Sequence, residues 1–477
     1  MGNEGNTGNY KDLLPLYGGR LERAMKKRQI GMLLCAAAAA IALAGCGSSK
    51  TKTEETRAGQ ESSKDSGKES SQAAAGGDVV IKVFSNLPDR TSGQGLIEQM
   101  LFDQYMEKNP NVKIQVEALD DESYKTKFKA YASGSDMPDL VNAWGQPSFL
   151  DEVIDAGLLA ELNPADYKDY GFIEGALDGF SKDGKLYGLA RNTDVMAFYY
   201  NKSMFEKFGV KVPETYDDLL AAVNTFKSAG VIPVSMDGSD KWPLSIYINA
   251  LYQQYNGSSS SKEIREAVKT GDYSNDAWTK SLDQLKKSID AGIFQTGFET
   301  TDYATSMNLF TNGQAAMYYM GSWEMSMATN ENIPEEIRNN IGVFNMPAVE
   351  GGKGTKTDLT AWNGGGHAVT ANSKVKAEAI KLLNYMYQPE NWSKLCWEKG
   401  VCMSAQNFSQ YLTGKETALQ LEFVDKVNHA SGISGVTFND LGTNEYKTVS
   451  EDASVEFAIG QLTAKDFTDK LAGAMKK

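Results

Sequence analysis

The chain has 477 residues, of which 41% are hydrophobic, and its 62 acidic and 48 basic side chains give a net charge of −14. This balance argues against nucleic acid and anionic membrane surfaces as partners, because both bind basic protein surfaces. The length exceeds what a single hydrophobic core usually accommodates, so we expect more than one folded unit.

The N-terminal part of the chain predicts a targeting signal that begins at Met25. Lys26-Lys27-Arg28 supplies its positive region, and residues 30–44 form an apolar segment too short to span a bilayer. The polar residues 1–24 have no role in such a signal, so we expect translation to start at Met25 and residues 25–45 to be removed. Removing residues 1–45, with six basic and three acidic side chains, changes the net charge from −14 to −17.

Leu43-Ala44-Gly45-Cys46 closes the apolar segment and resembles the lipobox of bacterial lipoproteins. In that motif the cysteine is lipidated and becomes the first mature residue, which predicts lipidation of Cys46. Residues 47–77 contain no aromatic residue, Leu, Ile, Val or Met. Such a segment buries too little apolar surface to order itself, so residues 46–77 are predicted to be a disordered spacer of roughly 30 Å.

Structure is predicted to begin at Val79 with alternating strands and helices. The run Val79 to Phe84 is rich in β-branched residues and predicts a mostly buried strand. The elements that follow are a helix over 95–108, a strand over 112–116, a helix over 124–133 and a strand over 140–143. This order predicts a parallel sheet covered by helices, with ligands at the carboxyl ends of its strands.

A second series of strands and helices follows residue 190. Thr215 and Asp218 have the spacing of a capping box and predict that a helix begins at Tyr216. The predicted elements are strands over 195–200, 232–235 and 315–320, and helices over 216–228, 243–253 and 277–291. A strand over 367–370 and a helix over 374–386 are expected to return to the first sheet.

The cysteines and histidines predict neither a metal site nor a cofactor. Cys396 and Cys402 remain after the signal and the lipidation site are set aside, and they form either one disulfide or two buried thiols. His367 and His429 are the only histidines, and no Cys/His cluster accompanies them. The run 364–366 is GGG without the flanking residues of a phosphate-binding loop, so it predicts a tight turn.

Five stretches together resemble the family 1 extracellular solute-binding proteins of ABC importers, the group that contains maltose-binding protein. Their order matches the family, and the resemblance extends over essentially all of 79–477. The stretches are MPDLVNAWG (137–145), GKLYGLARNTDVMAFYYNKSMFEKFGVKVPETYDDLLAA (184–222), FTNGQAAMYYMGSW (310–323), GHAVTANSKVKAEAIKLLNYM (366–386) and IGQLTAKDFTDKL (459–471).

The resemblance implies an α/β, two-lobed periplasmic-binding-protein-like fold with class II-type crossing segments, which closes on a ligand held between the lobes. By the same resemblance, the chain crosses between lobes near 190–192, 345–347 and 390–400. Lobe 1 is then expected to comprise 78–190 plus 348–395, and lobe 2 to comprise 191–347 plus 396–477.

A sugar-binding site requires aromatic platforms for the C–H faces of the rings and polar groups for the hydroxyls. Four tryptophans lie beside turn residues and are predicted platforms: Trp144, Trp242, Trp323 and Trp362. Trp278, Trp392 and Trp397 lie in helical patterns and are predicted to be packing residues. The predicted polar ligands, several of which equally suit ordinary turns, are Asn86, Asp89, Arg90, Asn192, Asp194, Asp240, Lys241 and Asn363.

These features together predict a lipid-anchored monomer on the outer face of the cell membrane. By resemblance, it captures a sugar or oligosaccharide and delivers it to the permease subunits of an ABC importer. The alternative is a secreted, lipid-anchored glycan-active enzyme, which requires two carboxyl groups roughly 5–10 Å apart. No GxSxG or HExxH motif is present in the sequence, and nothing marks a catalytic carboxyl pair.

Overall fold

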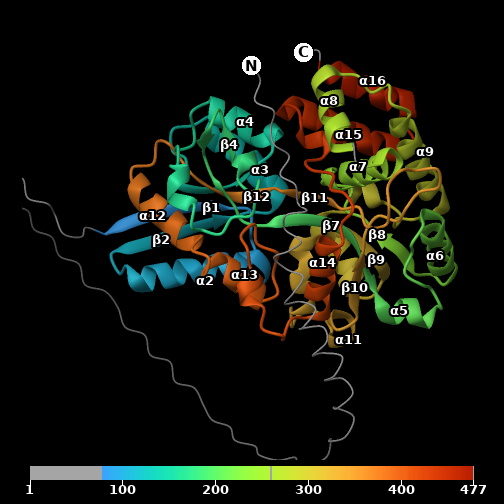
Figure 1. Cartoon of the computed structure of the whole chain (residues 1–477), viewed down its shortest axis with the longest axis horizontal. Coiled ribbons are helices and arrows are strands. Elements are labelled where there is room, and N and C mark those ends of the chain that lie inside the picture. Colours follow the sequence, from blue (N-terminus) through green and yellow to red (C-terminus); the bar gives the residue numbers. More distant parts are fainter. Residues whose placement is uncertain (1–77, 258–259, 476–477) are drawn as a thin grey trace, which may run out of the picture.

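The computed structural model describes residues 78–257 and 260–475, which form two α/β lobes side by side (Figure 1). The predicted extension 1–24, signal 25–45, lipidation site Cys46 and spacer 46–77 lie outside the described residues. Within the described residues, no helix is both long and apolar enough to cross a membrane.

The first lobe is built on a five-stranded sheet of order β2-β1-β3-β12-β6. β1 runs parallel to β2 and β3, whereas β12 is antiparallel to β3 and β6. The strands are β1 (Val79–Ser85), β2 (Val112–Ala118), β3 (Leu140–Trp144), β6 (Leu189–Ala190) and β12 (Gly365–Val369). The helices are α2 (Gly93–Lys108), α3 (Asp121–Ala132), α4 (Pro147–Asp155), α12 (Lys376–Met386) and α13 (Trp392–Glu398), and β4 (Ser181–Lys182) pairs with β5 (Lys185–Leu186).

The second lobe has a sheet of order β10-β7-β9-β8, with β11 also paired to β7. Its strands are β7 (Thr193–Asn201), β8 (Ile232–Ser235), β9 (Ala315–Gly321), β10 (Ile341–Phe344) and β11 (Thr360–Asn363). Its helices are α5 (Lys202–Lys207), α6 (Tyr216–Ser228), α7 (Trp242–Asn256), α8 (Ser260–Thr270), α9 (Asp276–Ala291), α10 (Tyr303–Thr311), α11 (Glu335–Arg338), α14 (Ala418–Asn428), α15 (Asn444–Ala458) and α16 (Ala464–Ala474).

Local sequence signals explain several of these elements. Ile81, Val83 and Phe84 of β1 are all buried in the first lobe, as the β-branched run predicts. The capping box at the start of α6 is confirmed, because the Thr215 side chain accepts from the backbone of Asp218 and the Asp218 side chain accepts from the backbone of Thr215. The helix therefore begins at Tyr216 and ends at Ser228, as predicted.

The chain passes between the sheets three times, and the second and third passages differ from their expected positions near 345–347 and 390–400. The first passage is Arg191-Asn192, between β6 and β7. The second was expected near 345–347 but lies at Gly364, because β11 pairs with β7 and only β12 joins the first sheet. Residues 348–363 thus belong to the second lobe. The third passage lies between 401 and 417, since α13 packs on α2 and α14 packs on β10.

The predicted packing tryptophans are confirmed as core residues: Trp278, Trp392 and Trp397 are among the largest fully buried side chains. Cys396 and Cys402 are both buried and carry free thiols, so the structure selects the second of the two alternatives left open by the sequence. Burial and the adjacent Cys402 raise the pKa of the Cys396 thiol, which keeps it protonated.

Candidate functional site

Three of the four predicted platform tryptophans form one aromatic row in the second lobe. Trp242 begins α7, Trp323 follows β9, and Trp362 lies in β11. The ring centroids of Trp242 and Trp323 are 5.9 Å apart, and those of Trp323 and Trp362 are 6.5 Å apart. The row brings together residues more than a hundred positions apart in the sequence.

The middle ring of this row is held by a tyrosine. The indole N–H of Trp323 donates to the hydroxyl of Tyr303 at 2.8 Å, and that hydroxyl donates to the Glu324 carboxylate. Burial raises the pKa of Glu324, although the hydrogen bond from Tyr303 opposes this shift. The orientation of Trp323 is therefore fixed by two side chains that sequence reasoning missed.

The fourth predicted platform, Trp144, lies at the end of β3 in the first lobe. It packs edge-on against Tyr124 and Phe149, at centroid distances of 5.6 and 5.0 Å. The ammonium group of Lys125 lies 5.4 Å from its ring centroid. Trp144 also pairs with Gly365 across β3 and β12, beside the second passage.

Polar side chains join the two lobes at the first passage. Arg191 donates from Nη1 to Asn86 Oδ1 and from Nε to Asn192 Oδ1, both at 3.1 Å. Asn86 in turn donates to the carboxylate of Asp121 at 2.9 Å. Asn192 donates to Asp194, so one network extends from the end of β1 to the start of β7.

Asp194 is a buried carboxyl at the meeting point of two passages. It accepts from the backbone N–H groups of Gly364 and Gly365 and from the Asn192 side chain. Burial raises its pKa to about 7, against the charge of Arg191 and these hydrogen bonds. A Cβ at Gly364 would lie 2.8 Å from Asp194 Oδ2 and 2.5 Å from Trp362 Nε1, so glycine is required for this close approach.

A pair of carboxyl groups lies in the loop after β8. Asp237 is fully buried, and its Oδ1 accepts the backbone N–H of Asp240 at 3.2 Å. Burial and the carboxyl of Asp240 raise the pKa of Asp237, and burial and the charge of Glu122 raise the pKa of Asp240. Two neighbouring carboxyl groups in a buried site do not both ionise readily, so the pair retains a proton at neutral pH.

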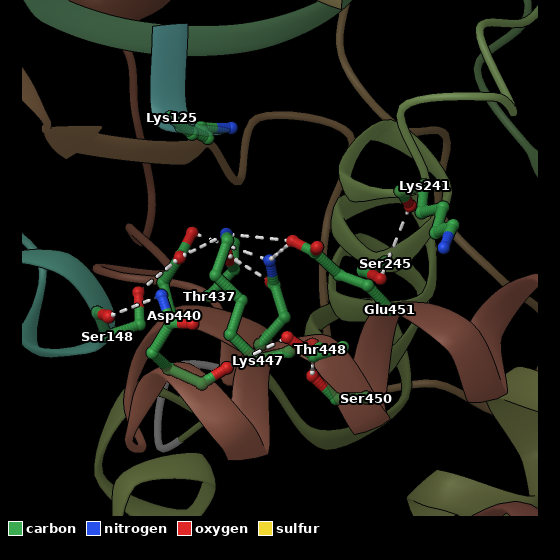
Figure 2. Close-up of polar contacts among 12 residues, drawn as sticks. Lys125, Ser148, Lys241, Ser245, Thr437, Asp440, Lys447, Thr448, Ser450 and Glu451 are labelled. Atoms are coloured by element: carbon green, nitrogen blue, oxygen red, sulfur yellow. Dashed lines mark hydrogen bonds and ion pairs between the residues drawn. The ribbon is translucent and has the colours of Figure 1, made fainter. Parts of the chain in front are cut away.

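Figure 2 shows a polar cluster where the second lobe meets the first. Lys447 of α15 pairs with Asp440 at 2.5 Å and with Glu451 at 2.8 Å. Ser148 of α4 donates to the same Asp440 oxygen at 2.7 Å. The backbone N–H of Asn444 donates to Glu152 of α4 at 3.2 Å. The lobes therefore touch through α4 and α15.

Four predicted ligands make contacts that do not link the lobes. Asp89 is exposed and accepts from Thr91 and Ser92, as in an ordinary turn. Arg90 pairs with the buried Glu98, which also bonds His367. Lys241 pairs with Asp452 at 2.6 Å, and both side chains are almost half exposed. Asn363 accepts from Thr193 at 2.9 Å and ties β11 to β7.

The predicted and newly found residues that lie where the lobes meet form one set, which we call the inter-lobe site. Sequence reasoning missed part of it, although Arg191 could have been found as the charged residue directly before the predicted Asn192. Asp121 and Lys125 have the i,i+4 spacing of a helical ion pair, which does not mark a binding site, and Asp237 has no local signal. The inter-lobe site comprises Asn86, Asp121, Lys125, Trp144, Arg191, Asn192, Asp194, Asp237, Asp240, Trp242, Trp323 and Trp362. In the described part of the chain, no group of three or more His, Cys, Asp or Glu side chains is arranged to hold a metal ion.

Known proteins share this architecture. The chain is 25% identical over 286 residues to the multiple sugar-binding protein of Streptococcus mutans, covering 58% of this chain and 65% of that protein. It is 28% identical over 257 residues to an uncharacterized ABC transporter extracellular-binding protein of Pyrococcus horikoshii, covering 52% of this chain and 56% of that protein. The matched part thus spans less than two thirds of either relative.

A solved structure of a chitin oligosaccharide binding protein has the same fold. It superposes with a TM-score of 0.73 at 21% identity and covers 84% of this chain and 98% of that one. The sequence model of the bacterial extracellular solute-binding protein family matches residues 88–391, which is more than half of the chain. The two-lobed fold and this match agree: the chain belongs to the bacterial extracellular solute-binding protein family.

Proposed function

We propose that this protein captures a sugar or oligosaccharide between its lobes and delivers it to an ABC importer. The aromatic row of Trp242, Trp323 and Trp362 carries the proposal, because it lies beside the Arg191–Asp194 network. Aromatic faces pack against the C–H faces of sugar rings, and the adjacent polar groups bind hydroxyls. Relatives named for sugars and for ABC transport support the same function.

The contacts between α4 and α15 support a closing motion. A ligand that touches both lobes binds the closed form more tightly than the open form, and so shifts the population toward closure. The permease then distinguishes loaded from empty receptor by its shape. We expect the protein to work as a monomer without a cofactor.

The proposal is tested by a thermal-shift screen of the full chain in detergent against a panel of oligosaccharides. We expect at least one saccharide to raise the melting temperature in a concentration-dependent manner. Chromatography of the same mixtures should recover the saccharide unchanged. Cleaved product would instead support the glycan-active enzyme.

One observation favours binding over hydrolysis. The carboxyl pair with raised pKa, Asp237 and Asp240, lies within one loop and shares a proton. Carboxyl groups that hydrolyse glycosides flank the bond from opposite sides, roughly 5–10 Å apart. This pair therefore suits hydrogen bonding to a ligand better than catalysis.

Lipid anchoring through Cys46 is part of the proposal and rests on the sequence. It would keep the receptor beside its transporter. Replacement of Cys46 by Ser should release the protein from membranes into the soluble fraction. Unchanged membrane association of Cys46→Ser would contradict the anchor without affecting sugar binding.

A further inference from the structure

The cationic side chains around the inter-lobe site are already paired. Lys125 lies 2.7 Å from Asp121 and 2.6 Å from Glu122. Lys447 pairs with Asp440 and Glu451. Lys241 pairs with Asp452. Each ammonium group therefore has at least one carboxylate of the protein as its partner.

Arg191, the remaining cation of the site, is also engaged. Its Nε and Nη1 donate to Asn192 and Asn86. Its charge acts on the buried Asp194, where it lowers the pKa against the effect of burial. Arg191 is also only 6% exposed, so little of its guanidinium is open to a ligand carboxylate.

Two carboxyl groups of the inter-lobe site, by contrast, have no cationic partner. No lysine or arginine in the described part of the chain forms an ion pair with Asp237 or Asp240. The charges that act on Asp240 from the facing lobe are those of Glu122, Asp121 and Lys125, of which two are negative. An anionic ligand beside this loop would thus meet like charge from both lobes.

Several polar atoms without partners suit hydroxyl groups. Among the described residues, Asp237 Oδ2, Trp242 Nε1 and Asn142 Nδ2 are buried and make no hydrogen bond. Asp237 and Trp242 are separated by one loop, and the amide oxygen of Asn142 accepts the backbone N–H of Asn86 at 3.2 Å. Hydroxyl groups donate and accept, so they satisfy both kinds of atom, whereas a carboxylate only accepts.

We propose that the inter-lobe site accepts uncharged saccharides and rejects saccharides that carry a carboxylate, and that Asp240 determines this selectivity. This inference rests on the proposed function and narrows its ligand class. Asp240 is half-buried and can meet the ligand, whereas Asp237 is fully buried, and its raised pKa leaves it with the proton that the pair retains at pH 7.

The test uses matched saccharides that differ in charge alone. Calorimetric titrations of the full chain are carried out at pH 7 with α-1,4-galactotriose and α-1,4-trigalacturonate, and with cellotriose and β-1,4-triglucuronate, in which carboxylates replace the primary alcohols. The expected result is that at least one neutral member binds and that its acidic counterpart binds at least about tenfold more weakly. An acidic member that binds as tightly as its neutral counterpart would overturn the inference while leaving the proposed function intact.

Binding of no saccharide, neutral or acidic, across these probes and the wider panel would overturn the proposed function and this inference with it. The residue assignment is tested with Asp240→Asn, which should reduce the neutral-to-acidic ratio severalfold. The control Asp283→Asn removes one exposed charge on α9 and should leave the ratio unchanged. If Asp240→Asn does not fold, Asp240→Ser is measured in the same way. An unchanged ratio in the folded variant would overturn the assignment.

Discussion

The hydroxyl of Ser148 in the first lobe donates a 2.7 Å hydrogen bond to the Asp440 carboxylate in the second lobe. The two residues are 292 positions apart in the sequence, and both are buried. Asp440 also pairs with Lys447, so one carboxylate links α4 of the first lobe to α15 of the second. This contact holds the two lobes against each other, and in the proposed function it stabilises the closed form.

Ser148→Ala should therefore favour the open arrangement of the lobes. Loss of this buried hydrogen bond removes about 1–2 kcal/mol from the closed form, which shifts the open-to-closed ratio about 5- to 30-fold. Small-angle X-ray scattering without ligand should show a larger radius of gyration than the parent protein. Ser133→Ala, which removes an exposed hydroxyl bonded within its own helix, is the control. Identical scattering by Ser148→Ala and the parent would contradict the assignment.

Lys447→Met should destabilise the fold. The Lys447 side chain is 15% exposed, and its partners Asp440 and Glu451 are 6% and 13% exposed. Removing the ammonium leaves two desolvated carboxyl groups without their shared cation, at a cost of about 3 kcal/mol in unfolding free energy. Urea denaturation measures this loss. Lys465→Met breaks an i,i+4 pair of the same kind whose side chains are 81% and 62% exposed, and should have little effect. Equal effects of the two variants would contradict the burial argument.

Tyr303→Phe should weaken saccharide binding without removing the aromatic row. The variant leaves the Trp323 indole N–H and the Glu324 carboxylate without their shared partner. Trp323 then samples other orientations, and we expect a loss in affinity of about tenfold. Calorimetry measures the affinity, and near-ultraviolet circular dichroism reports the tryptophan environment. Tyr385→Phe, whose hydroxyl lies at the surface of the first lobe beside Lys108, should change neither. An unaltered affinity in Tyr303→Phe would exclude this positioning role.

The pH dependence of stability should reflect the buried Asp194. Its pKa rises from 3.8 to about 7 on folding, so the folded state binds the proton more tightly than the unfolded state. The stabilising contribution of this proton is fully present below pH 3.8 and is lost as the pH rises to about 7.

The Asp194→Asn variant has no carboxyl proton to release at this position, so it does not lose this stabilising contribution as the pH rises. The unfolding free energy of the variant relative to the parent should therefore increase between pH 5 and pH 8, by on the order of 2 kcal/mol. Glu98, whose pKa is lowered to about 2 by His367 and Arg90 against the effect of burial, titrates below this range and does not interfere. Parallel stability profiles of variant and parent would show that Asp194 does not titrate in this window.

Local patterns in the sequence were sufficient to predict much of the fold. The β-branched run of β1 and the capping box before α6 depend on neighbours in the chain, and both were found where expected. The second passage was predicted at the wrong residues. Its position at Gly364 follows from the pairing of β11 with β7, and these two strands are far apart in the sequence. Nothing near residue 364 reports that pairing.

The same distinction applies to the inter-lobe site. Trp242, Trp323 and Trp362 each lie beside a turn, and this local feature selected the three rings that now form one row. Asp89 and Arg90 lie in an equally suitable loop but are held by Ser92 and by the buried Glu98. The Ser148–Asp440 pair forms only after folding, so no spacing in the sequence indicates it. Asp121 and Lys125 do have the i,i+4 spacing of a helical ion pair, but that spacing does not show that they face the second lobe.

The most direct measurement is a calorimetric titration of the full chain and of Trp323→Ala with a saccharide that raises the melting temperature. We expect saturable one-to-one binding by the parent protein, and an affinity lower by at least about tenfold in Trp323→Ala because the central ring of the row is lost. Trp397→Phe, a conservative change in the core of the first lobe, should bind like the parent if it folds. Failure of every saccharide to bind, or equal affinity of Trp323→Ala and the parent, would contradict capture of a sugar between the lobes.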